Sequence, residues 1–139
     1  MVVAGVDLGK RRIGLAVGNL GQFSAYPVVT IERGRSLRAD LETLRARLAA
    51  LEARRIVVGL PLNMDGTAGP QARAAQAFAR RLEEATGIPV ELCDERLSSF
   101  EAEERLKGLP LPRRNRRKLA IDAVAASVIL ETWLRSQKP

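Results

Sequence analysis

The chain has 139 residues, of which 46% are apolar and 28% charged, and it carries a formal net charge of +7. This composition excludes a disordered chain and predicts one globular domain over residues 1–139, large enough to bury a core. The positive charge favours an anionic partner, most commonly nucleic acid. The sequence contains no histidine and one cysteine, Cys93, which excludes histidine catalysis and zinc sites built from histidine or cysteine.

The sequence also predicts a cytoplasmic protein with no membrane partner. No charged segment precedes the first apolar run, which is too short for a signal peptide. No apolar stretch has the length that a helix needs to cross a bilayer. A lone cysteine that forms no internal disulfide fits a reducing compartment. A monomer and a homodimer are both compatible with the sequence.

Three short apolar runs joined by turns open the chain and predict an antiparallel meander. They span residues 2–8, 13–18 and 23–31. Pro27 interrupts the third run. Because proline cannot donate a hydrogen bond to a neighbouring strand, we expect the third strand at an edge of the sheet.

Helices and strands alternate in the rest of the chain. Ser36 is an expected N-cap, and leucines recur every three or four residues after it. Pro70 and Gly87 mark the start and the end of a second helix. The expected elements are a helix over 37–51, a strand over 55–60, a helix over 70–86, a strand over 88–93, a short helix over 98–108 and a last helix over 116–135. The order βββαβαβαα predicts an α/β fold, with a five-stranded mixed sheet of three antiparallel N-terminal strands and two further parallel strands, flanked by helices.

Acidic residues occur at three informative places. Two lie within apolar patterns, where a charge is costly, and the third lies at the end of a strand, where functional sites form. Asp7 interrupts a strand that is otherwise apolar. Asp122 is the only charged residue in the apolar arc of the last helix, where catalysis and pairing with a basic residue explain it equally well. Asp94 and Glu95 end the fifth strand, at the edge where α/β sheets gather their sites. Adjacent strand residues face opposite ways, so only one of these two points at a shared site, and spacing does not choose between them.

Carboxylates that converge without histidine form a ligand set for Mg²⁺ or Mn²⁺. In two-metal phosphodiesterase sites the ions lie roughly 3.5–4 Å apart and hold both the attacking and the leaving oxygen. Without metal, such carboxylates repel one another and raise one another's pKa values. The sequence therefore predicts a centre that binds Mg²⁺ or Mn²⁺, with two ions, and that is less stable at neutral pH when metal is absent.

Basic residues flank these acidic positions. Residues 105–118 contain seven basic side chains and no acidic one, in a proline-broken segment just before Asp122. This pattern predicts contacts with a phosphate backbone. Asn63, Asp65 and Thr67 follow the fourth strand and either line the same cleft or cap the following helix. The predicted nucleic-acid contacts are Lys10, Arg11, Arg12, Asn63, Arg113, Arg114, Arg116, Arg117 and Lys118.

Four segments, in order along nearly the whole chain, resemble the YqgF family, also called RuvX. They are residues 7–18, 57–67, 94–98 and 122–126, the last followed by 129–131. The resemblance implies an RNase H-like fold and a divalent-metal nuclease. It assigns the catalytic and metal-binding carboxylates to Asp7, Glu95 and Asp122, and it thereby selects Glu95 over Asp94. All three carboxylates are present in this sequence.

The same resemblance implies two substrates. One is structured RNA, in the maturation of the 5′ end of pre-16S rRNA during ribosome biogenesis, and this is the role we expect. The other is branched DNA, with the protein acting as a Holliday junction resolvase in recombination. Two further classes are a non-catalytic nucleic-acid-binding module, which the three intact carboxylates disfavour, and an ATP-binding phosphotransferase. The phosphotransferase needs two such domains around its nucleotide, and this chain supplies one.

Overall fold

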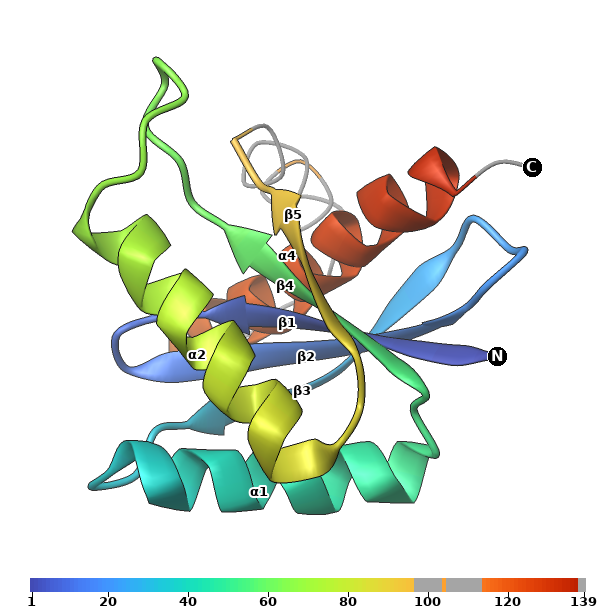
Figure 1. Ribbon diagram of the computed structural model, residues 1–139, viewed down its shortest axis with the longest axis horizontal. Coiled ribbons are helices and arrows are strands. Elements are labelled where there is room, and N and C mark those ends of the chain that lie inside the picture. Colours follow the sequence, from blue (N-terminus) through green and yellow to red (C-terminus); the bar gives the residue numbers. More distant parts are fainter. Residues whose placement is uncertain (97–103, 105–113, 138–139) are drawn as a thin grey trace.

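A computed structural model describes residues 1–96, 104 and 114–137, and of residues 114–120 it describes the backbone alone. Eight elements lie in these ranges (Figure 1). They are β1 (Val2–Leu8), β2 (Arg12–Asn19), β3 (Ala25–Glu32), α1 (Leu37–Leu51), β4 (Arg55–Leu60), α2 (Pro70–Thr86), β5 (Val90–Asp94) and α4 (Arg114–Ser136). Their order is the predicted one. Of the short helix expected over 98–108, only residue 104 lies within the described residues.

The five strands form one mixed sheet in the order β3-β2-β1-β4-β5. β2 is antiparallel to both β1 and β3, whereas β4 is parallel to both β1 and β5. The predicted meander and the two added parallel strands are thus confirmed, and β3 lies at an edge as Pro27 indicated. Because β1, β4 and β5 are parallel, their carboxyl ends meet at the same edge of the sheet.

Helices cover both faces of the sheet, with α1 and α2 on one face and α4 on the other (Figure 1). Side chains alternate between these two layers along β1. Ala4 and Val6 pack with α1 and α2, while Val3 packs with α4. Since successive strand residues face opposite sides, Asp7 shares the α4 face with Val3.

Three boundaries differ from the predicted ones by two residues, and the others agree to within one residue. β3 begins at Ala25 rather than 23, and its pairing with β2 shifts register opposite Pro27. β5 begins at Val90 rather than 88. The backbone N–H of Ile88 donates to the hydroxyl of Thr86 at the end of α2 and is therefore not free to pair with a strand. α4 begins at Arg114 rather than 116. None of these shifts moves a carboxylate out of its element.

Helix α4 lies directly on β2 because residue 14 has no side chain. A Cβ built on Gly14 would collide with the backbone carbonyl of Asp122 and come within 2.9 Å of the backbone nitrogen of Ala123. Backbone atoms cannot rotate away from such a contact. We therefore expect Gly14→Ala to lower the free energy of unfolding by about 1–3 kcal/mol or more, and the thermal midpoint by roughly 3–12 °C.

Gly34→Ala is the matched control for this change. The nearest atoms to its added Cβ are 3.5 Å away, an ordinary contact. Its effect on the unfolding free energy should stay within about 0.5 kcal/mol. Equal thermal midpoints for the two variants would contradict the direct packing of α4 on β2.

Candidate active site

Strand register brings three acidic positions from distant parts of the chain to one edge of the sheet. Asp7 pairs with Gly14, and the backbone of Asp122 passes over that glycine. Asp94 pairs with Leu60 at the end of β4. The next residue, Glu95, donates its backbone N–H to the Leu60 carbonyl at 3.2 Å. β1, the carboxyl end of β5 and α4 thus each bring candidate carboxylates to this edge.

Glu95 extends over the α4 face because Gly59 leaves room for it. Glu91 and Cys93, four and two residues earlier, also contact α4, so Glu95 continues their side of the strand. A Cβ on Gly59 would overlap Oε2 of Glu95 and come within 2.7 Å of Ile129. That oxygen is buried and has no hydrogen-bond partner among the described residues. Burial, and then the charges of Asp7 and Asp94, raise the pKa of Glu95 to about 7.

Asp7 has no compensating cation in the part of the chain that the structure describes. Among the described residues its carboxylate has no hydrogen-bond or ion-pair partner. Burial, and then the charge of Asp122, raise its pKa to about 6. The charge of Asp122 thus acts on Asp7, and the charge of Asp7 acts on Glu95. An uncompensated carboxylate in such a place is costly in the free protein, and a bound cation would offset that cost.

Asp122 is half-buried and paired with a basic residue. Nε of Arg12 donates to Oδ2 of Asp122 at 2.7 Å. Pairing at the rim of the core, one of the two explanations left open by the sequence, is therefore present. Sequence reasoning missed this contact because the two residues are 110 positions apart. Arg12 was predicted to contact nucleic acid, and that role stays a prediction.

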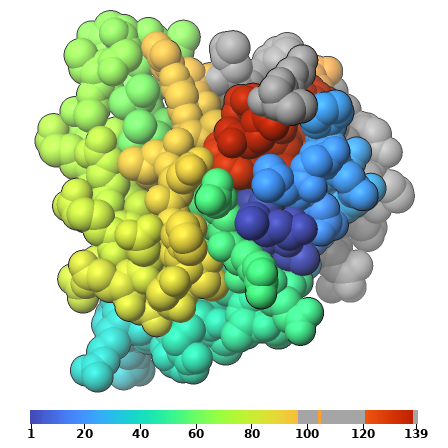
Figure 2. Space-filling model, turned by 45° about the vertical axis from the view of Figure 1, so that its right-hand side comes forward, coloured from blue at the N-terminus to red at the C-terminus, as the bar shows by residue number. Residues whose placement is uncertain are grey.

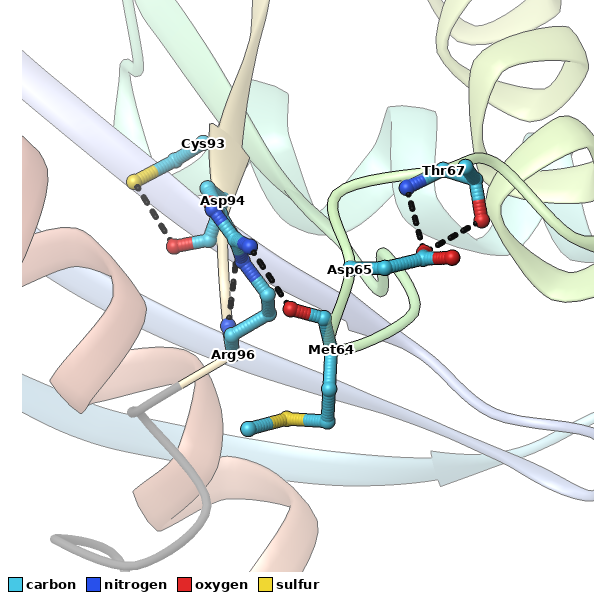
Figure 3. A network of polar contacts seen from close by, with 6 residues as sticks. All are labelled: Met64, Asp65, Thr67, Cys93, Asp94 and Arg96. Carbon is cyan, nitrogen blue, oxygen red and sulfur yellow. Dashed lines mark hydrogen bonds and ion pairs between the residues drawn. The ribbon is translucent and has the colours of Figure 1, made fainter.

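Asp94 turns away from this centre. It is exposed and forms an ion pair with Arg96, whose guanidinium also donates to the carbonyl of Met64 at 3.3 Å (Figure 3). The hydrogen bond from Arg96 lowers the pKa of Asp94. Asp94 and Glu95 are thus separated as strand alternation requires. This geometry supports Glu95 as the member of the pair that joins Asp7.

The loop after β4 does not cap α2. Asp65 accepts hydrogen bonds from the backbone and hydroxyl of Thr67, and Asn63 donates to the same hydroxyl at 3.0 Å. The N-cap of α2 is Gly69, and no side chain caps that end. Of the two uses considered for these residues, helix capping is wrong. Asn63 instead lines a cavity of about 590 Å³ together with Lys10 and Glu95.

The remaining predicted nucleic-acid contacts are placed only in part. Arg11 is exposed in the turn between β1 and β2. Arg113 lies outside the described residues. Arg114, Arg116, Arg117 and Lys118 lie in the first turns of α4, for which the backbone alone is described.

Sequence reasoning also missed an ion pair that supports the turn after β1. Nε of Arg33 donates to Asp40 at 2.9 Å, and Nη1 of the same side chain donates to the carbonyl of Gly9 at 2.9 Å. Only 4% of the Asp40 side chain is exposed. A signal was available, because Asp40 lies three residues after Leu37 and next to Leu41, on the leucine face of α1. Through the hydrogen bond to Gly9, this ion pair fixes the backbone two residues after Asp7.

The donor atoms of Asp7 and Glu95 fit a divalent cation. Both carboxylates lack a cationic partner in the described part of the chain, and one of their oxygens is buried without a donor. Carboxylate oxygen is the ligand that Mg²⁺ and Mn²⁺ prefer. Within the described residues, no three acidic, histidine or cysteine side chains gather closely enough to enclose one ion. The fit thus rests on the Asp7–Glu95 pair, with Asp122 held nearby by Arg12.

Known proteins identify the family. The family model RuvX, described as "Holliday junction resolvase", matches residues 1–136. This chain belongs to the RuvX family. A protein of Anaeromyxobacter sp. (strain K) is 52% identical over 139 residues, all of both chains, and one of Myxococcus xanthus is 42% identical over all of this chain and 91% of its own. Both bear the name "Putative pre-16S rRNA nuclease".

Solved structures agree on the fold. RuvC of Thermus thermophilus has a TM-score of 0.58 at 18% identity, over 98% of this chain and 96% of its own. RuvC of T. thermophilus in complex with a Holliday junction substrate has a TM-score of 0.56 at 17% identity, over 99% and 96%. The predicted RNase H-like fold is thus confirmed.

The predicted family and enzyme class are confirmed as well. This RuvX member is a nuclease, a hydrolase of nucleic-acid phosphodiester bonds. Among its described residues, no helix combines the length and the apolar character that a membrane crossing requires.

Proposed function

We propose that this RuvX nuclease is a cytoplasmic endonuclease that depends on Mg²⁺ or Mn²⁺ and processes the 5′ end of pre-16S rRNA. The observation that carries the metal dependence is the Asp7–Glu95 pair. Both carboxylates are partly buried and have no cationic partner among the described residues, and one oxygen of Glu95 is buried there without a hydrogen-bond donor. The names of relatives that are 42–52% identical support the RNA substrate.

Different residues of the chain bind the metal ions, orient a carboxylate and contact the phosphates around the scissile bond. When bound, divalent ions lower the pKa of a water molecule and neutralise charge on the phosphate. Asp7, Glu95 and Asp122 would hold these ions. Arg12 orients Asp122 through its 2.7 Å hydrogen bond. Lys10 and the arginines at the start of α4 contact neighbouring phosphates, so binding should weaken as salt rises.

Cleavage of Holliday junctions is the second candidate. The description of the RuvX family model favours it. Symmetric cutting of a four-way junction requires two active sites related by two-fold symmetry, and therefore a homodimer. Cleavage of one RNA strand needs only a monomer. The mass of the protein in solution, with and without each substrate, separates these two requirements.

The test compares wild type with Asp7→Asn on an RNA that carries the 5′ leader of 16S rRNA and on a four-way DNA junction, each with Mg²⁺ or Mn²⁺. Wild type should cut the RNA faster than the junction, and Asp7→Asn should lose both activities. Equal cleavage by the two proteins would show that Asp7 is not in the active site. A wild type that binds both substrates and cuts neither would replace the enzyme by a non-catalytic binding module.

A further inference from the structure

A cavity of about 590 Å³ adjoins the carboxylate centre. It lies between the turn that joins β1 to β2, the loop after β4 and the first turn of α2, which lie on the left of Figure 1. Glu95 contributes to its lining and so connects it with the site described above. Its volume is within the range of about 300–1,000 Å³ for small-molecule sites. A single phosphate group would leave most of it empty.

Positive groups line part of this cavity. The Lys10 side chain is exposed and has no hydrogen bond or ion pair within the described residues. Arg33 also lines the cavity, and its guanidinium is fixed by Asp40 and by the carbonyl of Gly9. Asn63 adds an amide. Lys10 can therefore pair with a phosphate without first breaking another contact, next to an arginine whose side chain is already ordered.

Apolar groups line the rest of it. Leu8, Pro61, Pro70 and Ala74 present aliphatic surface to the cavity. Aliphatic surface gains free energy when it covers the face of a base or a sugar. Gly69 and Pro70 begin α2 without a capping side chain, which adds the partial positive charge of a helix N-terminus to the same wall. The combination of an apolar wall, an amide and a lysine without a partner among the described residues matches a nucleotide better than a bare anion.

We propose that this cavity binds one unpaired nucleotide of the substrate, next to the scissile phosphate. The inference rests on the proposed function and names the substrate class more narrowly. A nucleotide stacked and paired in a duplex cannot enter such a cavity unless it is first unpaired. The preferred substrate is therefore a nucleic acid with an unpaired nucleotide beside the cut.

The first test measures nucleotide binding without catalysis. The full chain in EDTA is titrated with adenosine 5′-monophosphate, and separately with inorganic phosphate, while backbone amide signals of Lys10, Asn63 and Gln71 are followed by NMR. The nucleotide should shift these signals and bind more tightly than phosphate. Unmoved signals, or equal affinity for phosphate, would overturn the proposal.

Filling the cavity provides a matched pair of variants. Ala74 lines it, whereas Ala77 is an exposed alanine of α2 outside its lining. Ala74→Trp should weaken nucleotide binding by about tenfold or more, and Ala77→Trp by less than about twofold. Both sites are exposed on a helix, so both variants should fold, and thermal melts check this. An equal loss in both would overturn the proposal, and Ala74→Leu, a smaller filler, should give an intermediate loss.

The second test measures cleavage of two RNAs that differ only in whether the nucleotide beside the cut is paired. Wild type should prefer the unpaired form by about tenfold or more, and Ala74→Trp should lose that preference. If nucleotide binding follows Ala74 but no preparation cuts any nucleic acid, the proposed function fails and the cavity stands as a nucleotide site. If Asp7-dependent cleavage is found while Ala74→Trp behaves as wild type, the cavity inference alone fails.

Discussion

Glu95→Gln should lower the rate of cleavage by roughly 10²–10⁴-fold, since a metal centre supplies several kcal/mol of transition-state stabilisation. Glutamine keeps the shape of the side chain over Gly59 and removes the charge that holds the cation. Oε2 of Glu95 is buried and has no donor among the described residues, which is the arrangement expected of a carboxylate that binds a cation. Rates under single-turnover conditions, with substrate binding measured separately, give the size of the effect.

Asp94→Asn is the matched control, because it makes the same chemical change one residue earlier. Asp94 is exposed and engaged with Arg96, away from the centre (Figure 3). Its rate should remain within about threefold of wild type, as expected for a surface substitution. A large loss for Asp94→Asn together with a small one for Glu95→Gln would reverse the assignment of the two neighbours.

Asp7→Asn should stabilise the metal-free protein at pH 8 by about 2–3 kcal/mol, because a shift of about two pKa units corresponds to that free energy. The pKa of Asp7 is raised from 3.8 to about 6 by burial first and then by Asp122. The thermal midpoint should rise by roughly 6–12 °C. The variant would thus gain stability while losing activity, as expected from the trade-off between stability and activity at active sites.

The sign of the pH dependence follows from the raised pKa. The folded state holds the proton of Asp7 more tightly than the unfolded state does. The stability contributed by the protonated group is complete below pH 4 and is lost as the pH rises through about 6. Glu95, with its pKa raised from 4.5 to about 7, adds a loss of the same sign that extends to about pH 7. The gap between wild type and Asp7→Asn should therefore be near zero at pH 4 and complete at pH 8.

Thermal melts of both proteins from pH 4 to 8, in EDTA and with Mg²⁺, measure this gap. Comparing the two proteins removes the effect of the titrating groups that do not interact with Asp7, whereas Glu95, whose pKa Asp7 raises, still contributes to the gap. Mg²⁺ should raise the midpoint of wild type at pH 8 and leave Asp7→Asn nearly unchanged. A gap that does not vary with pH would show that Asp7 is not strained by burial, and an unmoved wild-type midpoint would argue against metal binding at this pair.

Local patterns were sufficient for the described elements, and they singled out two of the three candidate acidic positions. Proline at 27 indicated an edge strand, leucine spacing indicated α1, and Pro70 with Gly87 bounded α2. Asp7 and Asp122 stood out because a charge inside an apolar pattern is costly wherever the element packs. The start of β3 and that of β5 differ from the predicted ones because a proline or a hydrogen bond at a helix end competed with strand pairing. The strand propensities of single residues do not account for such competition.

The sequence by itself therefore determined the order of the elements, the acidic character of the site and, through four matched segments, the RuvX family. Only the tertiary structure decided which way Asp94 and Glu95 point, that Arg12 pairs with Asp122, and that a cavity adjoins Glu95. The physical reason is range. Periodicity and capping act over a few residues, whereas these contacts depend on the register of parallel strands and on α4 lying against glycines of β2 and β4, between residues as many as 110 positions apart.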